Sequence, residues 1–262
     1  MRRRIFQILG TIIPNSYFGA FTGKLIYQGN LKSFCVPSLN CYACPLALFS
    51  CPIGTLQHFI MIRQIPFYTI GILGVTGAVV GRMVCGWICP FGFLQDILYR
   101  IRSFKIKIPS KLSYLKYVSL IFVVGVIVFF TQESWFCKLC PQGALQAGIP
   151  LVIASEEIRN LIGGFFVLKL SILAGFLFLF VISKRPFCRL FCPLGAIYSL
   201  FNRISLVRLK FDENLCTRCN ECVTSCPADI VPYTSLNSSD CIMCWGCMRI
   251  CPEKAISSEF EF

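Results

Sequence analysis

The stretch CTRCNECVTSCPADIVPYTSLNSSDCIMCWGCMRICP, residues 216–252, decides how the C-terminal part of the chain folds. It holds two successive runs of the form C-x2-C-x2-C-x3-C-P, which begin at Cys216 and Cys241. Three thiolates on such a loop hold three corners of a [4Fe–4S] cluster, and the fourth cysteine reaches across to the other cluster. Zinc fits eight cysteines in this arrangement poorly. The expected ligand sets are Cys216, Cys219, Cys222 and Cys251 for one cluster, and Cys241, Cys244, Cys247 and Cys226 for the other.

The composition of the whole chain is that of a membrane protein. Of the 262 residues, 56% are apolar and only 14% are charged, whereas an ordinary soluble domain is about 25% charged. A small disulfide-rich secreted protein is excluded as well, because the 18 cysteines lie in a long chain. Dense cysteine in a long apolar chain indicates metal centres within a membrane protein.

Charge divides the chain into two predicted domains. Residues 1–210 hold 22 Lys and Arg against four acidic residues, whereas residues 211–262 hold three against eight. We expect a transmembrane domain over 1–210 and an acidic ferredoxin domain over 211–262. Nucleic-acid binding is excluded, because the cations flank apolar runs and form no stripe on a soluble face.

Four apolar segments have a composition suited to crossing a bilayer, which takes about 20 helical residues. They cover residues 5–27, 66–84, 117–130 and 161–182. The first contains Pro14 and follows three arginines, so a signal peptide is the alternative. No small-x-small cleavage site follows it, and we therefore expect a retained helix.

The distribution of Lys and Arg predicts the orientation. Basic residues are concentrated at the N-terminus, after the second segment and after the fourth, and they are sparse in residues 28–65 and 131–160. By the positive-inside rule, both chain ends lie on the cytoplasmic side of the cell membrane. The sparse loops then lie outside.

An internal repeat supports this frame. The heptapeptides CPIGTLQ, CPFGFLQ, CPQGALQ and CPLGAIY begin at Cys51, Cys89, Cys140 and Cys192. Proline after the cysteine suits the first turn of a helix, and the glycine permits close approach of other atoms. The predicted fold is an all-α membrane body of about four transmembrane helices in two parallel repeats, plus a small α+β 2[4Fe–4S] ferredoxin domain.

The repeat gathers cysteines at each end of the body. Cys85, Cys89, Cys188 and Cys192 face each other at the cytoplasmic end and predict a third [4Fe–4S] cluster. At the outer end six cysteines compete for a fourth, and the preferred ligands are Cys137, Cys140, Cys51 and Cys44, with Cys41 next. Disulfides are the alternative there, with Cys35 as a candidate member, because an oxidising outer face permits them.

Two cations in the membrane body require an explanation. Lys169 lies within the fourth apolar segment, where an ammonium group is costly and usually has a function. It is predicted to offset cluster charge or to bind a quinone, and polar contact between helices is the alternative. Arg82, one turn before Cys85, is interpreted as part of the basic flank rather than as a residue that tunes a cluster.

The chain resembles the membrane polyferredoxins of the quinol-dehydrogenase type. The similarity is carried by VCGWICPFGFLQD at residues 84–96, by RPFCRLFCPLGAIYSLFNRISL at residues 185–206 and by the tandem ferredoxin runs. The resemblance implies a helical membrane anchor with a cytoplasmic 2[4Fe–4S] module that transfers electrons between quinone, or a soluble reductant, and a redox protein. The cysteine-rich segment SFCVPSLNCYACPLALFSCPIG departs from that pattern and indicates a different terminal partner.

The expected function is therefore electron relay through an integral membrane iron–sulfur subunit that is not itself catalytic. Its expected partners are lipid, redox proteins and, as an option, a quinone. The acidic ferredoxin domain is suited to a basic partner. The alternative is an assembly factor that reduces a metal or a disulfide in another complex. A redox sensor is the third reading, but no output domain follows residue 262.

Overall fold

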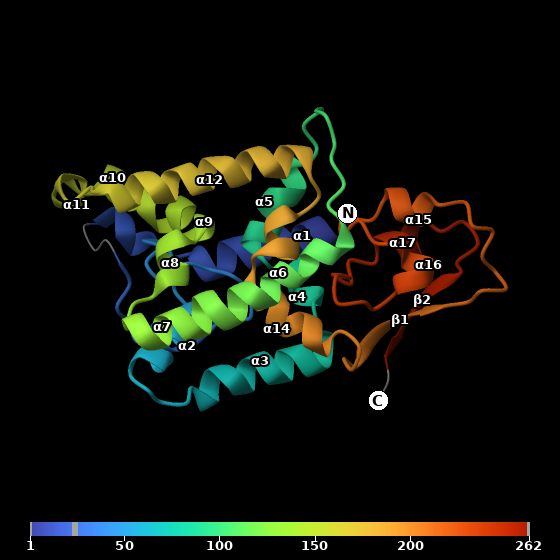
Figure 1. Ribbon diagram of the computed structural model, residues 1–262, viewed down its shortest axis with the longest axis horizontal. Helices are drawn as coiled ribbons and strands as arrows, with labels where there is room; N and C mark the ends of the chain where they lie inside the picture. The colour runs from blue at the N-terminus through green and yellow to red at the C-terminus, as the bar shows by residue number, and fades with distance from the viewer. Residues whose placement is uncertain (1, 23–25, 261–262) are drawn as a thin grey trace.

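The structure is a computed structural model that describes residues 2–22 and 26–260. A helical body carries a smaller C-terminal module at one end (Figure 1). The α-helices of the body are α1 (Arg2–Ile12), α2 (Pro52–Met61), α3 (Phe67–Val80), α4 (Met83–Trp87), α5 (Pro90–Leu98), α6 (Leu115–Val118), α7 (Ile127–Thr131), α8 (Trp135–Leu139), α9 (Pro141–Gly143), α10 (Ile149–Ala154), α11 (Glu156–Asn160), α12 (Gly164–Ile182), α13 (Pro186–Leu190) and α14 (Pro193–Phe201). Short 3-10 turns lie at Ile13–Asn15, Phe18–Thr22, Asn30–Ser33 and Ser110–Tyr114, and π-helical turns at Ser119–Val126 and Ala144–Gly148.

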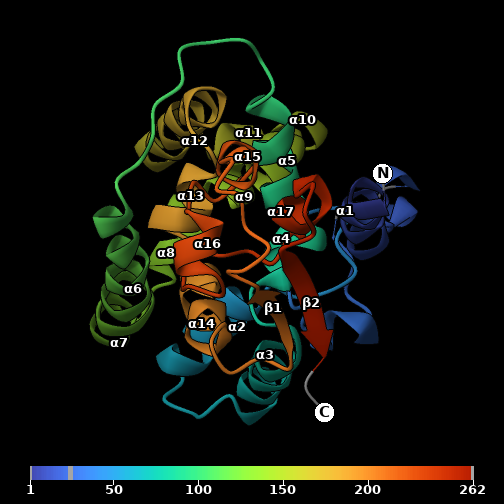
Figure 2. The same ribbon diagram turned by 90° about the vertical axis from the view of Figure 1, so that its right-hand side faces the viewer.

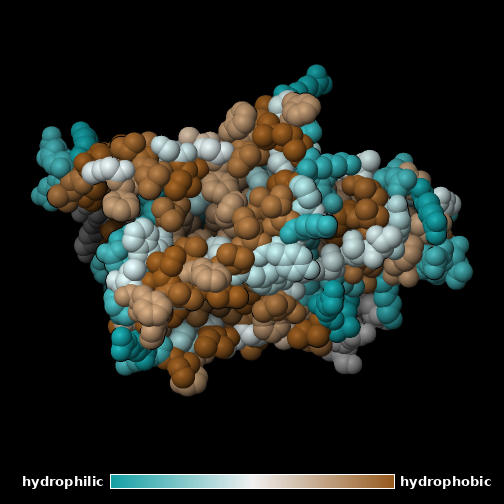
Figure 3. All heavy atoms as spheres, in the orientation of Figure 1, coloured by the Kyte–Doolittle hydropathy of each residue, from teal (hydrophilic) through white to brown (hydrophobic). Residues whose placement is uncertain are grey.

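Two helices are long and apolar enough to cross a membrane. One is the continuous helix Ser110–Thr131, which includes α6 and α7, and the other is α12. Most of their apolar side chains are exposed, and Figure 3 shows this hydrophobic surface between hydrophilic ends. Since water solvates such a surface poorly, lipid suits it better. These two helices match the predicted segments 117–130 and 161–182.

The other two predicted segments do not form helices of that length. Segment 5–27 is interrupted: α1 ends at Ile12, a 3-10 turn with Pro14 follows, and residues 23–25 lie outside the described part. Proline removes a backbone donor, which explains the break. In segment 66–84, α3 spans only 14 residues and stops at Gly81, whose φ of +53° favours glycine. The chain then turns directly into α4.

Viewed from the C-terminal module, α1, α3, the Ser110–Thr131 helix and α12 lie on different sides of the body (Figure 2). The short helices α4, α5, α13 and α14 fill the space between them. Their buried faces meet in one core that includes Phe91, Phe180 and Tyr198 together with several cysteines. The long helices therefore enclose the cysteine motifs.

The segment from Cys35 to Ser50 is irregular, yet it lies inside the body. Cys35 and Ser50 form an isolated parallel bridge, and Leu48 donates its backbone N–H to the carbonyl of Pro14 at 2.9 Å. From the other half of the chain, the Tyr198 hydroxyl donates to the carbonyl of Pro37 at 2.8 Å. These bonds satisfy backbone groups that lie away from water, so this cysteine-rich loop reaches into the centre.

The C-terminal module is a small α+β unit. Strands β1 (Val207–Phe211) and β2 (Ile256–Phe260) pair antiparallel, with Val207 opposite Phe260 and Phe211 opposite Ile256. Between them lie α15 (Glu221–Thr224), α16 (Pro232–Ser235) and α17 (Gly246–Ile250). Because β1 begins at Val207, the module starts four residues before the predicted boundary at 211.

Candidate iron–sulfur centres

Each Cys-Pro-x-Gly motif begins a helix in the same way. Cys51, Cys89, Cys140 and Cys192 occupy the N-cap positions of α2, α5, α9 and α14, and the following proline is the first helical residue. Proline is suited to this position, because the first helical N–H has no partner within the helix. The motif therefore presents each cysteine at the start of a short helix.

The first buried group contains the four cysteines predicted for the inner end. Cys85 and Cys188 lie in α4 and α13, and Cys89 and Cys192 precede α5 and α14. All four are at most 6% exposed, and Cys192 interacts electrostatically with the other three. We call them the inner quartet.

Two arginines hold the inner quartet by equivalent bonds. Arg185 donates to the carbonyl of Cys85 at 2.7 Å, and Arg82 donates to the carbonyl of Cys188 at 3.0 Å. Each arginine precedes the cysteine of its own motif by three residues, so each binds the other half of the repeat. Arg82 is 0% exposed. It is therefore a buried structural residue, which corrects its interpretation as a basic flank.

Glutamines form a second equivalent pair. Gln95 donates its side-chain N–H to the Cys188 sulfur at 3.0 Å, and Gln57 donates to the Cys137 sulfur at 3.3 Å. Both are the seventh residue of their heptapeptides and both are fully buried. Sequence reasoning missed them, although the glutamine shared by three of the four heptapeptides is a visible signal.

The second group is made of Cys41, Cys51, Cys137 and Cys140, which we call the outer quartet. Cys140 interacts electrostatically with Cys137 and Cys41, and Cys51 interacts with Cys137 and Cys140. All four line one cavity of about 700 Å³. Cys44 is buried beside Cys41 but does not line that cavity, and Cys35 contacts the hydroxyl of Thr55 at 3.3 Å. The structure therefore favours Cys41 over Cys44.

Lys169 lines the same cavity. A Cβ built on Gly143 would lie 3.4 Å from the Lys169 Nζ and 3.6 Å from the Cys41 sulfur. The single membrane lysine of α12 is thus beside the outer quartet. Asn40, which is 1% exposed, also lines the cavity, and neither its Nδ2 nor its Oδ1 has a hydrogen-bond partner.

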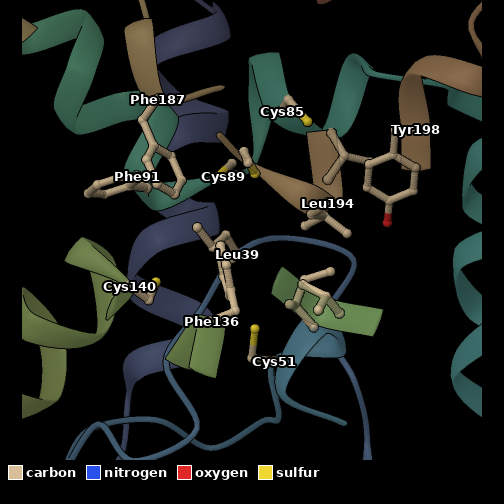
Figure 4. Close-up of a cluster of buried hydrophobic side chains, with 14 of the residues drawn as sticks. Leu39, Cys51, Cys85, Cys89, Phe91, Phe136, Cys140, Phe187, Leu194 and Tyr198 are labelled. Atoms are coloured by element: carbon tan, nitrogen blue, oxygen red, sulfur yellow. The ribbon is translucent and has the colours of Figure 1, made fainter. Parts of the chain in front are cut away.

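The inner and outer quartets are neighbours rather than occupants of opposite surfaces. The backbone N–H of Leu39 bonds to Cys89 of the inner quartet, and Cys41 of the outer quartet follows two residues later. Figure 4 shows Leu39 between Cys89 on one side and Cys51 and Cys140 on the other. Because a residue spans at most about 3.6 Å of chain, residues 39–41 keep the two groups close.

The C-terminal module gathers its own two quartets. One small cavity is lined by Cys226, Cys241, Cys244 and Cys247, and another by Cys216, Cys219, Cys222 and Cys251. These are the sets expected from exchange of the fourth cysteine between the runs. We call the first set the proximal quartet and the second the distal quartet. Residues next to the proximal quartet are in contact with the helical body.

The proximal quartet is held against the inner quartet by backbone contacts. Trp87 donates to the carbonyl of Met243 at 3.0 Å, and Asn202 donates to the carbonyl of Cys241 at 2.6 Å. A Cβ on Gly86 would lie 2.6 Å from the carbonyl oxygen of Ile242, so only glycine permits this approach. The module is therefore docked on α4, which carries Cys85, and on Asn202 at the end of α14.

Buried charges reinforce this docking. Asp240 accepts from Lys116 at 2.7 Å, and Arg82 lies 3.7 Å from the same carboxylate. Burial alone would raise the pKa of Asp240, but the Lys116 hydrogen bond and the charges of Lys116 and Arg82 outweigh it and lower the pKa. The pKa of Asp96 is lowered in the same way. Burial would raise it, but the charge and hydrogen bonds of Arg185 outweigh that effect. Each carboxylate therefore stays ionised beside its cations.

The donor sets suit iron–sulfur clusters. Each quartet consists of thiols, which are the usual ligands of a [4Fe–4S] cluster, and all 18 cysteines are free. Within residues 2–22 and 26–260, no three His, Cys, Asp or Glu side chains are close enough to hold a single metal ion. The side-chain N–H groups of Gln95 and Gln57 donate to the sulfurs of Cys188 and Cys137. Such bonds match those that the sulfurs of a bound cluster accept.

Comparisons with known proteins agree with this chemistry. A family described as a 4Fe-4S binding domain matches residues 65–109, 115–152 and 165–212, and a second family of that description matches residues 209–231. No solved structure matches significantly.

Some similar proteins match nearly the whole chain, and others match only part of it. An uncharacterized protein of Methanocaldococcus jannaschii is 34% identical over 98% of this chain and 97% of its own length. The ferredoxin-type protein NapH of Haemophilus influenzae is 27% identical over 99% of this chain and 89% of its own. The methylamine utilization ferredoxin-type protein MauN of Methylobacillus flagellatus is 25% identical over 61% of this chain and 53% of its own. The chain therefore belongs to a family of ferredoxin-type proteins with 4Fe-4S binding domains, and NapH is among the proteins that are similar to it.

Proposed function

We propose that this chain is an integral membrane polyferredoxin with four [4Fe–4S] clusters, one in each cysteine quartet, and that it relays electrons along them. The observation that carries the proposal is the serial arrangement of the quartets. Leu39 joins the outer quartet to the inner one, and Trp87 and Asn202 join the inner quartet to the proximal one. A bound cluster supplies a one-electron carrier at each position.

The distal quartet is the proposed exchange point with a soluble partner. Cys219 is exposed, whereas the cysteines of the inner quartet are buried. The module around it carries more acidic than basic residues. A basic redox protein is therefore the proposed partner on that side, because opposite charge accelerates encounter.

We propose further that the chain crosses the cell membrane several times with both ends on the cytoplasmic side. Basic residues from three parts of the body meet near the C-terminal module: Arg3 pairs with Asp96, Lys116 with Asp240 and Lys184 with Asp229. This is the distribution that the positive-inside rule associates with the cytoplasm. The four-span, two-repeat arrangement is part of the same proposal, with α1 and α3 as shorter spans.

Electron transfer across liposomes tests the function. Purified protein is reconstituted around trapped ferricyanide, dithionite is added outside, and bleaching of ferricyanide is followed at its absorbance maximum. We expect bleaching with the native chain and none with the double variant Cys85→Ser and Cys188→Ser. A matched variant, Cys35→Ser, lies outside every quartet and should behave like the native chain. Equal bleaching of ferricyanide in all samples would contradict the relay.

The alternative is an assembly factor that reduces a metal or a disulfide through the outer cysteines. Iron analysis separates it from the relay. Four reactive thiols in the outer quartet and about 12 iron atoms per chain would favour thiol chemistry, whereas about 16 iron atoms would favour the relay.

A further inference from the structure

We infer that Lys169, assisted by Asn40, raises the reduction potential of the outer cluster. The inference rests on the proposed outer cluster. It assigns the charge of Lys169 to that cluster instead of to a quinone.

The first argument is the balance of buried charge around each centre. Next to the inner quartet, Arg185 is paired with Asp96 at 2.6 Å, while Arg82 and Lys116 share Asp240. Asp96 also pairs with Arg3, so two carboxylates are shared among four cations, and each of these cations contacts a carboxylate. Lys169 forms no ion pair with any carboxylate in residues 2–22 and 26–260, and no Asp or Glu lines its cavity.

The second argument is where that uncompensated charge points. The Lys169 Nζ and the Cys41 sulfur both lie within 4 Å of the position that a Gly143 Cβ would occupy. Electrostatic interactions link Lys169 with Cys41 and with Cys137. A cluster with four thiolates gains negative charge on reduction, and a nearby cation stabilises the reduced form more than the oxidised form.

The third argument is Asn40. Its amide is almost completely buried, lines the cavity and lacks protein partners at both polar atoms. A buried amide without a hydrogen bond is costly, which indicates that a group in the cavity satisfies it. A cluster sulfide or a cysteine sulfur beside Cys41 accepts such an N–H bond, and hydrogen bonds to sulfur raise the potential of a cluster.

A potentiometric titration followed by EPR tests the inference on the detergent-purified protein. In the native chain, the outer signal is identified by its loss in the Cys41→Ser plus Cys137→Ser variant. In Lys169→Met, the outer signal should shift to lower potential while iron per chain stays constant. Lys169→Arg should restore the native potential, because it keeps the charge.

The control is Lys138→Met. Lys138 also lines the cavity, but it is exposed and paired with Glu133 at 2.7 Å, so its removal should leave the potential nearly unchanged. If Lys169→Met does not fold, Lys169→Gln and Asn40→Leu give the same readout. An outer signal that is present but unmoved in these variants would overturn the inference. Absence of any outer signal from the native chain would overturn the proposed outer cluster itself.

Discussion

The seventh residue of the Cys-Pro heptapeptides links the two halves of each centre. Gln95 follows Cys89 but donates to Cys188, and Gln57 follows Cys51 but donates to Cys137. Neither bond is available to an aliphatic side chain of similar size. Each glutamine therefore belongs to one quartet, and its replacement should affect that quartet alone.

We predict that Gln95→Leu lowers the potential of the inner cluster and leaves the outer one unchanged, because an N–H bond to a cluster sulfur stabilises the reduced state. Gln57→Leu should lower the potential of the outer cluster and leave the inner one unchanged. The two variants are each other's control in one EPR titration. Equal shifts of both signals in either variant would show that the bonds are not specific to one centre.

At this scale the sequence predicted most of the cysteine groups and missed their supports. Spacing in the tandem runs predicted the proximal and distal quartets, and the repeat predicted the inner quartet. The choice between Cys41 and Cys44 was not accessible, because both precede Cys51 in a loop with no regular structure. Arg82 was misread, since a local sequence pattern cannot distinguish a lipid-facing flank from a residue that reaches across to Cys188.

Among the elements, α4 determines how the C-terminal module is attached. Gly86 lies in α4, and its missing side chain allows the carbonyl of Ile242 to approach. The same short helix contains Cys85 and Trp87, so one turn of backbone both carries a ligand of the inner quartet and forms the docking surface.

We predict that Gly86→Ala weakens this docking, because a methyl group 2.6 Å from a carbonyl oxygen requires a backbone shift. Overpacking of this kind costs about 1–3 kcal/mol. Limited proteolysis between residues 201 and 207 should become faster. Gly74→Ala in α3 is the matched control, since nothing lies within 4 Å of its added Cβ. Identical cleavage of both variants would contradict the role of α4 as the docking surface for the C-terminal module.

Helix lengths were the least predictable elements. Hydropathy alone indicated comparable spans, yet α1 and α3 are short while Ser110–Thr131 and α12 are long. Pro14 and Gly81 end the short helices. Hydropathy does not register these backbone constraints, because it averages over side chains.

In the whole molecule, Asp240 joins the membrane body to the C-terminal module. It is the common carboxylate of Arg82 and Lys116, which come from different parts of the body and are fully buried. Removal of one partner from a buried charge network leaves the other charges uncompensated and costs about 3–5 kcal/mol.

We predict that Asp240→Asn lowers the thermal stability of the purified protein and separates the module from the body. The double variant Asp240→Asn with Lys116→Met should recover part of the loss, because it removes a buried cation as well. A double variant no more stable than the single one would contradict the network. Circular dichroism during heating measures the thermal stability of the single and the double variant.

Charge predicts two domains and cysteine spacing predicts an α+β ferredoxin module, and the structure has two paired strands with short helices between residues 207 and 260. The closeness of the inner and outer quartets was not predictable from the sequence. The predicted membrane topology places residues 28–65 outside, and nothing in it indicates that Leu39 reaches Cys89. The packing of a polar, cysteine-rich loop within the body depends on distant bonds such as Tyr198 to Pro37.

The most direct test of the central claim, four clusters in four specific quartets, is iron and acid-labile sulfide per chain after anaerobic purification. The native chain should contain about 16 iron atoms. Cys41→Ser should lower the value towards about 12, whereas Cys44→Ser should leave it near 16, because Cys41 lines the outer cavity and Cys44 does not. Loss of iron from Cys44→Ser with none from Cys41→Ser would contradict the outer quartet, and a native value near 8 would contradict both membrane centres.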